Sequence, residues 1–342
     1  MAAKIERLTD PPAIGLAENA AAILAAGGLV AIPTETVYGL AGDATNGEAL
    51  ARIFQVKGRP RFNPLICHVD GPAMAERFAI FNDRARLLAE HFWPGPLTLV
   101  LPKRPDGPED NVHPLATAGL PTLGLRMPKG PVREIIAAFG RPLAAPSANL
   151  SGRLSPTRAD HVAAQLGSSI ELILDAGPCP VGLESTIVSL RSGEPARLLR
   201  PGGLSAGEIE AVLGEPLQRP QSGAAIEAPG MMASHYAPRA RLRLQAESVR
   251  PDEALLAFGP SLPDGRPLAV RNLSESGDLG EAAVNLFSFL AELDGEGVDK
   301  IAVMAIPDAP GTLGEAINDR LRRAALDPAL PAASDESEIN KP

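Results

Sequence analysis

The sequence is poor in cysteine, in aromatic residues and in positive charge, and it has no long apolar run. Only Cys67 and Cys179 are cysteines and they form no Cys-x-x-Cys pattern, so neither a disulfide scaffold nor a structural zinc site is expected. The formal net charge of -9 argues against general electrostatic binding to nucleic acid or to an anionic membrane. The apolar runs fall short of the roughly 18 residues that a membrane helix needs, and residues 1–6 lack the apolar core of a signal peptide. We therefore expect a reduced, cytoplasmic protein.

Several catalytic motifs are also missing. The sequence has no GxxxxGK[ST] phosphate loop, no GxGxxG after an expected strand and no HExxH. Its five histidines, His68, His91, His113, His161 and His235, show no metal-ligand spacing. Because no nucleophile and base stand together, covalent catalysis is not the favoured chemistry.

Apolar runs in the first two-thirds of the chain predict strands that alternate with helices. Strands are expected at residues 28–32, 65–69, 97–101, 122–126, 143–145, 170–174, 184–190 and 196–199. Helices are expected at 13–26, after a capping box at 45–48, at 83–92, after 155–157 and after a second capping box at 205–208. This pattern indicates an α/β (α+β) domain with a ligand cleft.

Polar turns follow several of these strands. Residues 28–32 end at Pro33, and a run with two threonines, a carboxylate and a phenol comes next. The loop at 57–64 is expected to be extended, which would place Lys57, Arg59 and Arg61 on one face. The candidate binding groups are Thr34, Thr36, Ser147, Asn149, Ser151, Ser185, Thr186, Lys57, Arg59, Arg126 and Arg200. Such hydroxyls, amides and cations suit the binding of polyanions, as phosphoryl and nucleotidyl transfer require.

A smaller second unit is expected after residue 238. Strands are predicted at 255–258 and 301–304, and helices at 279–293 and 313–325. We divide the chain into a catalytic domain at 1–215, a linker and active-site lid at 216–238, a C-terminal domain at 239–328 and a disordered acidic tail at 329–342.

Several motifs occur in the order that one known family shows. They are Pro33–Leu40, Lys57–Pro60 with Asn63–Leu65, Trp93–Thr98, Pro146–Asn149, Glu184–Thr186, Leu199–Gly202 and the linker Pro229–Pro238. The chain closely resembles the threonylcarbamoyl-AMP synthases in their long, two-domain form. The resemblance implies a YrdC-like twisted mixed sheet with flanking helices around a basic cleft, and a smaller Rossmann-like C-terminal domain.

The resemblance also implies a reaction. L-threonine, bicarbonate and ATP would give L-threonylcarbamoyladenylate and pyrophosphate, with Mg2+ held through the ATP phosphates and not by assigned side chains. The product would serve N6-threonylcarbamoylation of adenosine 37 in tRNA through a downstream transferase machinery. The protein is expected to be a monomer, to touch tRNA weakly or indirectly, and not to bind a membrane.

Site residues follow from the same resemblance. Lys57 and Arg59 would be catalytic. L-threonine would contact Thr36, His68, Arg126, Ala145 and Ser185. ATP would contact Arg59, Asn63, Thr122, Ser147, Ser155, Arg200 and Tyr236. A guanidinium at Arg126 suits the substrate carboxylate, because it can bind both oxygens.

Two other functions stay open at this point. A non-enzymatic RNA-binding module could use the same basic cleft, although the acidic net charge and the 4% aromatic content count against it. A carbamoyl-transfer relative would act on carbamoyl phosphate, but such relatives usually carry further zinc-binding and transferase regions that this sequence lacks.

Overall fold

The computed structural model describes residues 3–105, 111–219, 226–231 and 235–326. Parts of the predicted linker and the whole predicted tail at 329–342 lie outside these ranges. Among the described residues, no helix has the length and apolar character needed to cross a membrane.

The first part of the chain forms a mixed sheet in the order β1-β8-β2-β3-β7-β4-β6-β5-β9-β10. Its strands are β1 (Lys4–Arg7), β2 (Val30–Ile32), β3 (Gly39–Asp43), β4 (Ile66–His68), β5 (Leu97–Pro102), β6 (Thr122–Arg126), β7 (Leu143–Ala144), β8 (Leu172–Asp175), β9 (Thr186–Ser189) and β10 (Arg197–Arg200). Parallel pairs such as β4–β6 and β5–β9 stand beside antiparallel pairs such as β5–β6 and β9–β10. The predicted mixed sheet is therefore confirmed.

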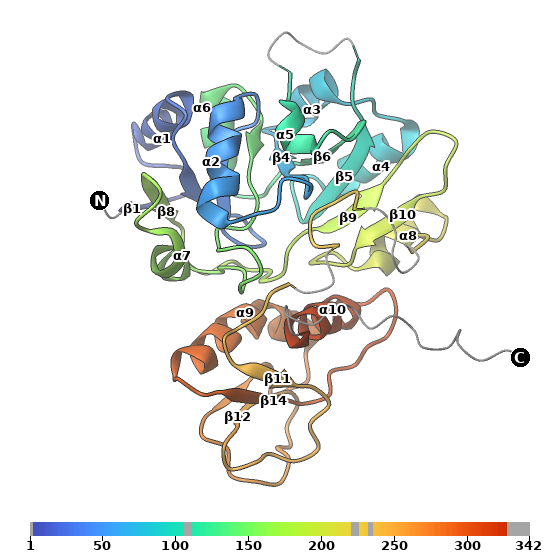
Figure 1. Cartoon of the computed structure of the whole chain (residues 1–342). Helices are drawn as coiled ribbons and strands as arrows, with labels where there is room; N and C mark the ends of the chain where they lie inside the picture. The colour runs from blue at the N-terminus through green and yellow to red at the C-terminus, as the bar shows by residue number, and fades with distance from the viewer. Residues whose placement is uncertain (1–2, 106–110, 220–225, 232–234, 327–342) are drawn as a thin grey trace, which may run out of the picture.

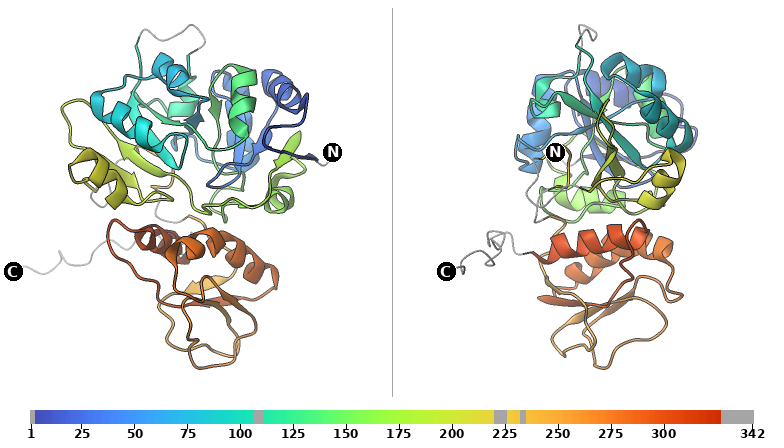
Figure 2. Two further views of the ribbon diagram at one scale, coloured as in Figure 1. Left: turned by 180° about the vertical axis from the view of Figure 1, so that it is seen from behind. Right: turned by 90° about the vertical axis from the view of Figure 1, so that its right-hand side faces the viewer.

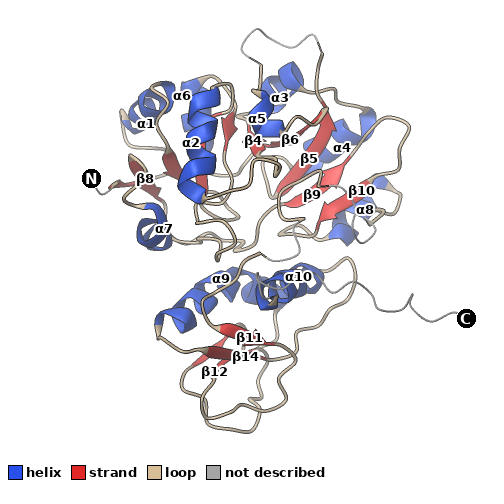
Figure 3. Ribbon diagram, viewed as in Figure 1, coloured by secondary structure: helices blue, strands red, loops and turns tan. Residues whose placement is uncertain are grey.

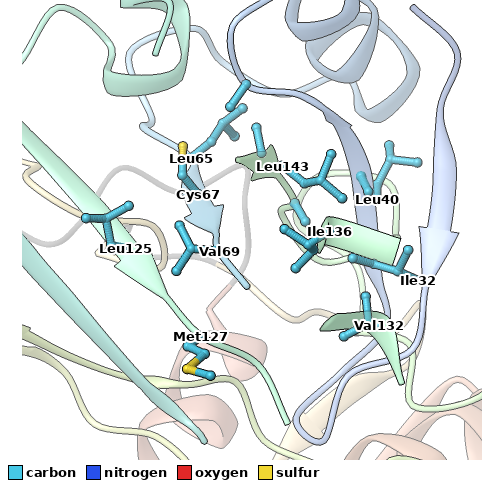
Figure 4. Packing of buried hydrophobic residues seen from close by; sticks show 14 of the residues in the cluster. Ile32, Leu40, Leu65, Cys67, Val69, Leu125, Met127, Val132, Ile136 and Leu143 are labelled. Carbon is cyan, nitrogen blue, oxygen red and sulfur yellow. The ribbon is translucent and has the colours of Figure 1, made fainter. Parts of the chain in front are cut away.

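Helices flank this sheet (Figures 1 and 3). They are α1 (Leu16–Ala25), α2 (Gly47–Lys57), α3 (Pro72–Phe78), α4 (Asp83–Phe92), α5 (Pro114–Thr117), α6 (Val132–Phe139), α7 (Ala159–Leu166) and α8 (Ala206–Leu213). Buried aliphatic side chains from the central strands and from α6 fill the space between the layers (Figure 4). The apolar runs that predicted the strands are the segments that this core buries.

Two local predictions are wrong, the capping box at 45–48 and the extended segment at 57–64. The N-cap of α2 is Asn46, whose side chain accepts from the backbone N–H of Glu48 and Ala49, whereas Thr45 donates its hydroxyl to Asp43. The segment that begins at Lys57 is not extended, because Lys57 is the last residue of α2 and Gly58, at φ 60°, caps the helix. Lys57 and Arg59 are buried and Arg61 is exposed, so the three charges do not share one face.

The capping box at Ser205 is confirmed. Its hydroxyl accepts from the Glu208 N–H, and the Glu208 carboxylate accepts from the Ser205 N–H. Residues 203–207 also spell GxSxG, the pattern of a nucleophile elbow. Because the Ser205 hydroxyl is taken up by the helix cap, we assign it no catalytic role.

The second part of the chain is a four-stranded parallel sheet in the order β11-β14-β12-β13. The strands are β11 (Arg241–Arg243), β12 (Ala254–Ala257), β13 (Val270–Asn272) and β14 (Lys300–Val303), with helices α9 (Leu279–Gly295) and α10 (Leu313–Ala325). Both helices lie between this sheet and the first part of the chain (Figures 1 and 2). The predicted Rossmann-like arrangement is confirmed in its parallel sheet and its helices.

One hydrophobic cluster joins the two parts. It contains the core of the second sheet and its helices together with Val37, Leu154 and Leu183 of the first part and Tyr236 of the linker. At Gly182 the two backbones meet so closely that a Cβ atom would lie 2.4 Å from the carbonyl oxygen of Ala283 in α9. The second part therefore packs directly behind residues that border the cavity described next.

Candidate active site

A cavity opens where the polar turns of the large sheet meet the linker. Nine of the predicted site residues line it: Thr36, Arg59, His68, Arg126, Ala145, Ser147, Ser185, Arg200 and Tyr236. Residues without a predicted role also border it, among them Thr34, Val37, Glu184 and His235. Four predicted site residues, Lys57, Asn63, Thr122 and Ser155, do not line this cavity. The strands thus bring together side chains from distant parts of the sequence.

The turn after β2 is held by its own hydroxyls. The Thr34 hydroxyl donates to the Val37 carbonyl at 2.6 Å, so it can only accept at the 2.8 Å contact with the Thr36 hydroxyl. The Thr36 oxygen accepts in turn from Nη1 of Arg126 at 2.8 Å. Thr34 is therefore a support, and Thr36 presents a fixed oxygen to the cavity.

Arg126, at the end of β6, is fixed on three sides. Its Nε donates to the Gly95 carbonyl at 3.2 Å, and its Nη2 lies 2.6 Å from Oε2 of Glu35. The same Glu35 oxygen accepts from the backbone N–H of Lys129. Both charged side chains are about nineteen-twentieths buried. A buried ion pair with these extra hydrogen bonds holds the guanidinium in one orientation at the cavity wall.

His68, at the end of β4, pairs with Arg126 in the sheet register. Burial, and to a smaller extent the positive charge of Arg126, lower its pKa to about 3. The imidazole is therefore neutral at physiological pH. A neutral ring can accept or donate one hydrogen bond without adding charge to the wall.

Two more arginines line the cavity. Arg59 donates to the carbonyls of Asn63 and Pro64, and its pKa is lowered to about 10 by burial and by nearby Arg200. Arg200, at the end of β10, donates to the Ser185 carbonyl at 2.8 Å and to its hydroxyl at 3.2 Å. Glu184 is the one carboxylate among the described residues that line the cavity. Arg126 is paired with Glu35, whereas Arg59 and Arg200 donate to carbonyls and hydroxyls, so these two cations favour an anionic ligand.

The turn after β10 depends on a glycine. A Cβ atom at Gly202 would lie 2.3 Å from the carbonyl oxygen of Glu184 and 2.5 Å from the backbone of Ser185. Only a residue without a side chain lets this turn lie against the Glu184–Ser185 segment. The glycine therefore fixes Arg200 beside Ser185.

Lys57 lies behind the wall of the cavity. Its amine donates to the carbonyls of Ser147 and Asn149, both at 2.5 Å, and burial, together with Arg59, lowers its pKa well below the usual value. It fixes the turn that presents Ser147. Its catalytic role stays a prediction, and so do the ATP contacts of Asn63 and Thr122, the latter at the opposite end of β6 from Arg126.

Ser155 bonds to a wall residue. Its hydroxyl donates to Oε1 of Glu184 at 2.5 Å. It also borders a neighbouring groove between the two parts of the chain, which Arg153, Pro238 and Asp294 help to line. The predicted ATP contact of Ser155 would therefore be made from the edge of the cavity.

The linker closes the remaining side. The rings of His235 and Tyr236 lie 4.0 Å apart, and the Tyr236 ring packs against Phe287 of α9. Tyr236 adopts φ 65°, a backbone conformation that an aromatic residue rarely takes unless its surroundings hold it. Arg320 of α10 supplies part of this support, with its guanidinium 5.2 Å from the ring centre.

Sequence reasoning gave no role to Glu184 or Arg320, which form an ion pair at 2.9 Å. Glu184 is the first residue of the motif Glu184–Thr186, so the motif itself is a sequence signal that could have identified it. Arg320 lies in a helix with several other charges, and no local signal separates it from its neighbours.

Comparisons with known proteins agree along most of the chain. Residues 22–202 match a family model described as telomere recombination, and residues 204–326 match one described as threonylcarbamoyl-AMP synthase, C-terminal domain. The chain is 41% identical to the threonylcarbamoyl-AMP synthase of Pyrococcus abyssi over 325 aligned residues, and this alignment covers 90% of this chain and 93% of that protein. It is 39% identical to the Bacillus subtilis threonylcarbamoyl-AMP synthase, in an alignment that covers 94% of this chain and 95% of that protein.

The fold has a close solved counterpart. A crystal structure of P. abyssi Sua5 complexed with L-threonine superposes with a TM-score of 0.84 at 36% identity. The match covers 94% of this chain and 97% of that one. Both sheets of the structure described above therefore belong to the shared fold.

Proposed function

The chain belongs to the threonylcarbamoyl-AMP synthase family, and from this premise we propose that it condenses L-threonine, bicarbonate and ATP into L-threonylcarbamoyladenylate and pyrophosphate. The observation that carries the proposal is the cavity in which Arg59, Arg126 and Arg200 converge beside the hydroxyls of Thr36 and Ser185. A zwitterionic substrate and a polyanionic one can share such a site. The solved relative in complex with L-threonine supports the first of these ligands.

Threonine would bind at the Arg126 wall. The guanidinium is oriented by Gly95, Thr36 and Glu35, so it can meet the substrate carboxylate without first ordering its own side chain. The Thr36 and Ser185 hydroxyls would recognise the substrate hydroxyl, and loss of such a bond would discriminate against an apolar analogue. Neutral His68 and the Ala145 backbone complete this half of the proposed site.

ATP would bind at the opposite wall. Arg59 and Arg200 would stabilise the phosphates, Ser147 would lie beside them, and Ser155 and Tyr236 would contact the nucleotide from the linker side. Mg2+ would arrive bound to the phosphates.

The proposed reaction has two steps. The free amine of threonine forms a C–N bond to the carbon of bicarbonate, and water leaves, which gives the N-carboxy species. A carbamate oxygen then attacks the α-phosphorus of ATP, and the bond to the pyrophosphate oxygen breaks. Arg59 and Arg200 would stabilise the charge that develops on the phosphates, while the linker would exclude water from the labile adenylate. The enzyme would thus be a nucleotidyltransferase, and its product would feed tRNA threonylcarbamoylation.

The test is pyrophosphate release by the purified full-length protein with Mg2+ and ATP. We expect release only when threonine and bicarbonate are both present. Release that ignores threonine would remove the proposed function. Tight tRNA binding with a steep salt dependence and no ATP turnover would favour an RNA-binding module instead.

A further inference from the structure

Arg320 is a buried cation that the second part of the chain inserts into the first. It stands on α10, is 1% exposed and is among the largest fully buried side chains. Its Nε donates to Oε2 of Glu184 at 2.9 Å, and its Nη1 donates to the Pro201 carbonyl at 2.8 Å. Both acceptors lie in the segments that form the Arg200 side of the cavity. A cation buried this deeply is stable only with such partners.

Glu184 links Arg320 to the cavity. One carboxylate oxygen accepts from Arg320 and the other accepts from the Ser155 hydroxyl. Burial alone would raise the pKa of Glu184, but Arg320, Arg200 and the Ser155 hydrogen bond together lower it below its usual value. The carboxylate is therefore ionised and held between two fixed donors. Its orientation determines where the Ser155 hydroxyl lies.

The same helix also holds the linker. The Arg320 guanidinium lies against the Tyr236 ring, and the carbonyl of Arg323 accepts from the backbone N–H of His235. A cation over an aromatic ring attracts it, and the attraction strengthens when water is excluded. Because Tyr236 adopts a rare backbone conformation, its place in the cavity depends on these contacts.

We propose that Arg320 is a positioning residue of the catalytic site, through which the second part of the chain sets the nucleotide half of the cavity. It acts through Glu184 on Ser155 and by direct contact on Tyr236. The threonine half has its own supports, since Arg126 and Thr36 are held by Glu35, Gly95 and Thr34. The inference rests on the proposed function, because Ser155 and Tyr236 are assigned there to ATP.

The first test compares the effect of changing Arg320 on ATP binding with its effect on threonine binding. Binding of Mg-ATP and of L-threonine is measured by titration calorimetry on the full chain. We expect Arg320→Met to weaken ATP binding by about tenfold, the loss of one charged hydrogen bond, and to change threonine binding by less than about twofold. Arg320→Lys should recover part of the loss, since it keeps the charge. Arg322→Met is the matched control, because Arg322 lies on the same helix but pairs with Asp308 on the surface.

The second test separates positioning from mere support of the fold. If Arg320 acts through Glu184, the change Arg320→Met should cost much less ATP affinity in a Glu184→Gln background than in the parent protein. The double variant removes both charges of the Glu184–Arg320 pair, so it should fold even if Arg320→Met alone does not, and its comparison with Glu184→Gln then measures what Arg320 contributes without Glu184. We expect Glu184→Gln to weaken ATP binding and the double variant to bind ATP only slightly more weakly still, because only the contact of Arg320 with Tyr236 is left to lose.

Two results would overturn the inference. One is an equal loss of ATP and threonine binding in Arg320→Met, and the other is losses that add fully in the double variant. Adenylate formation by the parent protein is measured first. A parent protein without threonine-dependent pyrophosphate release removes the proposed function, whereas an active parent whose Arg320→Met variant binds ATP normally removes only this inference.

Discussion

The Arg126–Glu35 pair allows binding and stability to be separated. Both side chains are buried and their charged atoms lie 2.6 Å apart. The change Arg126→Met removes the guanidinium but leaves Glu35 as a buried carboxylate that still accepts from the Lys129 N–H. Breaking one partner of a buried pair costs about 3–5 kcal/mol. We expect Arg126→Met to lower the free energy of unfolding by that amount at pH 7.

A second change should restore the stability but not the function. In Arg126→Met with Glu35→Gln no charge is left unpaired, so most of the loss should return, to within about 1–2 kcal/mol of the parent. Threonine binding should stay weak in both variants, because the guanidinium is missing from both. Arg158→Met is the control, since its partner Asp160 is exposed and a surface pair contributes at most about 1 kcal/mol.

The assay is urea unfolding followed by tryptophan fluorescence. Trp93 is the only tryptophan, and its indole donates to the Leu97 carbonyl two residues beyond Gly95, the partner of Arg126. It therefore reports on this region of the sheet. A loss of less than about 1 kcal/mol in Arg126→Met, or no recovery of stability when Glu35→Gln is added, would show that the pair is not a buried, coupled ion pair.

Two further predictions concern the other half of the cavity and the effect of acid. Arg59→Lys should weaken ATP binding about tenfold and leave threonine binding unchanged, because an amine cannot keep both carbonyl contacts and also bind a phosphate. Titration calorimetry with each ligand measures this, and equal losses of ATP and threonine affinity would contradict it. The pKa values of His68 and His235 are lowered to about 3, chiefly by burial, so below about pH 6.5 the unfolded chain takes up protons there that the folded protein does not. Stability should therefore fall by about 1.4 kcal/mol per pH unit for each of them as the pH drops from 6.5 to 5. Urea unfolding at several pH values should show a shallower slope in His68→Asn, and an unchanged slope would be evidence against a buried neutral His68.

The sequence identified the elements with strong apolar runs. β2, β5 and β6 are buried over nearly their whole length, so their composition alone marks them. β1 was missed because its residues are mostly exposed and polar, and it becomes a strand only through pairing with β8. The extended segment predicted from Lys57 failed because α2 continues to that residue before the glycine cap ends it.

The sequence identified most residues of the site but not their orientation or their long-range partners. Motif residues such as Thr36, Arg126 and Ser185 follow strands, and the sheet brings strand ends together. The structure adds which of them point into the cavity and which, like Lys57, lie behind it. The Glu184–Arg320 pair joins positions 136 residues apart, and a single sequence offers no local pattern for such a contact.

We propose that one cavity binds threonine, bicarbonate and ATP together and couples them in one reaction. The most direct measurement is pyrophosphate release with each of the three supplied or withheld in turn, accompanied by detection of the adenylate product. We expect pyrophosphate release and threonylcarbamoyladenylate only when all three are present, and loss of both in the double variant Arg126→Met with Glu35→Gln. Pyrophosphate release from ATP that proceeds without threonine would contradict it.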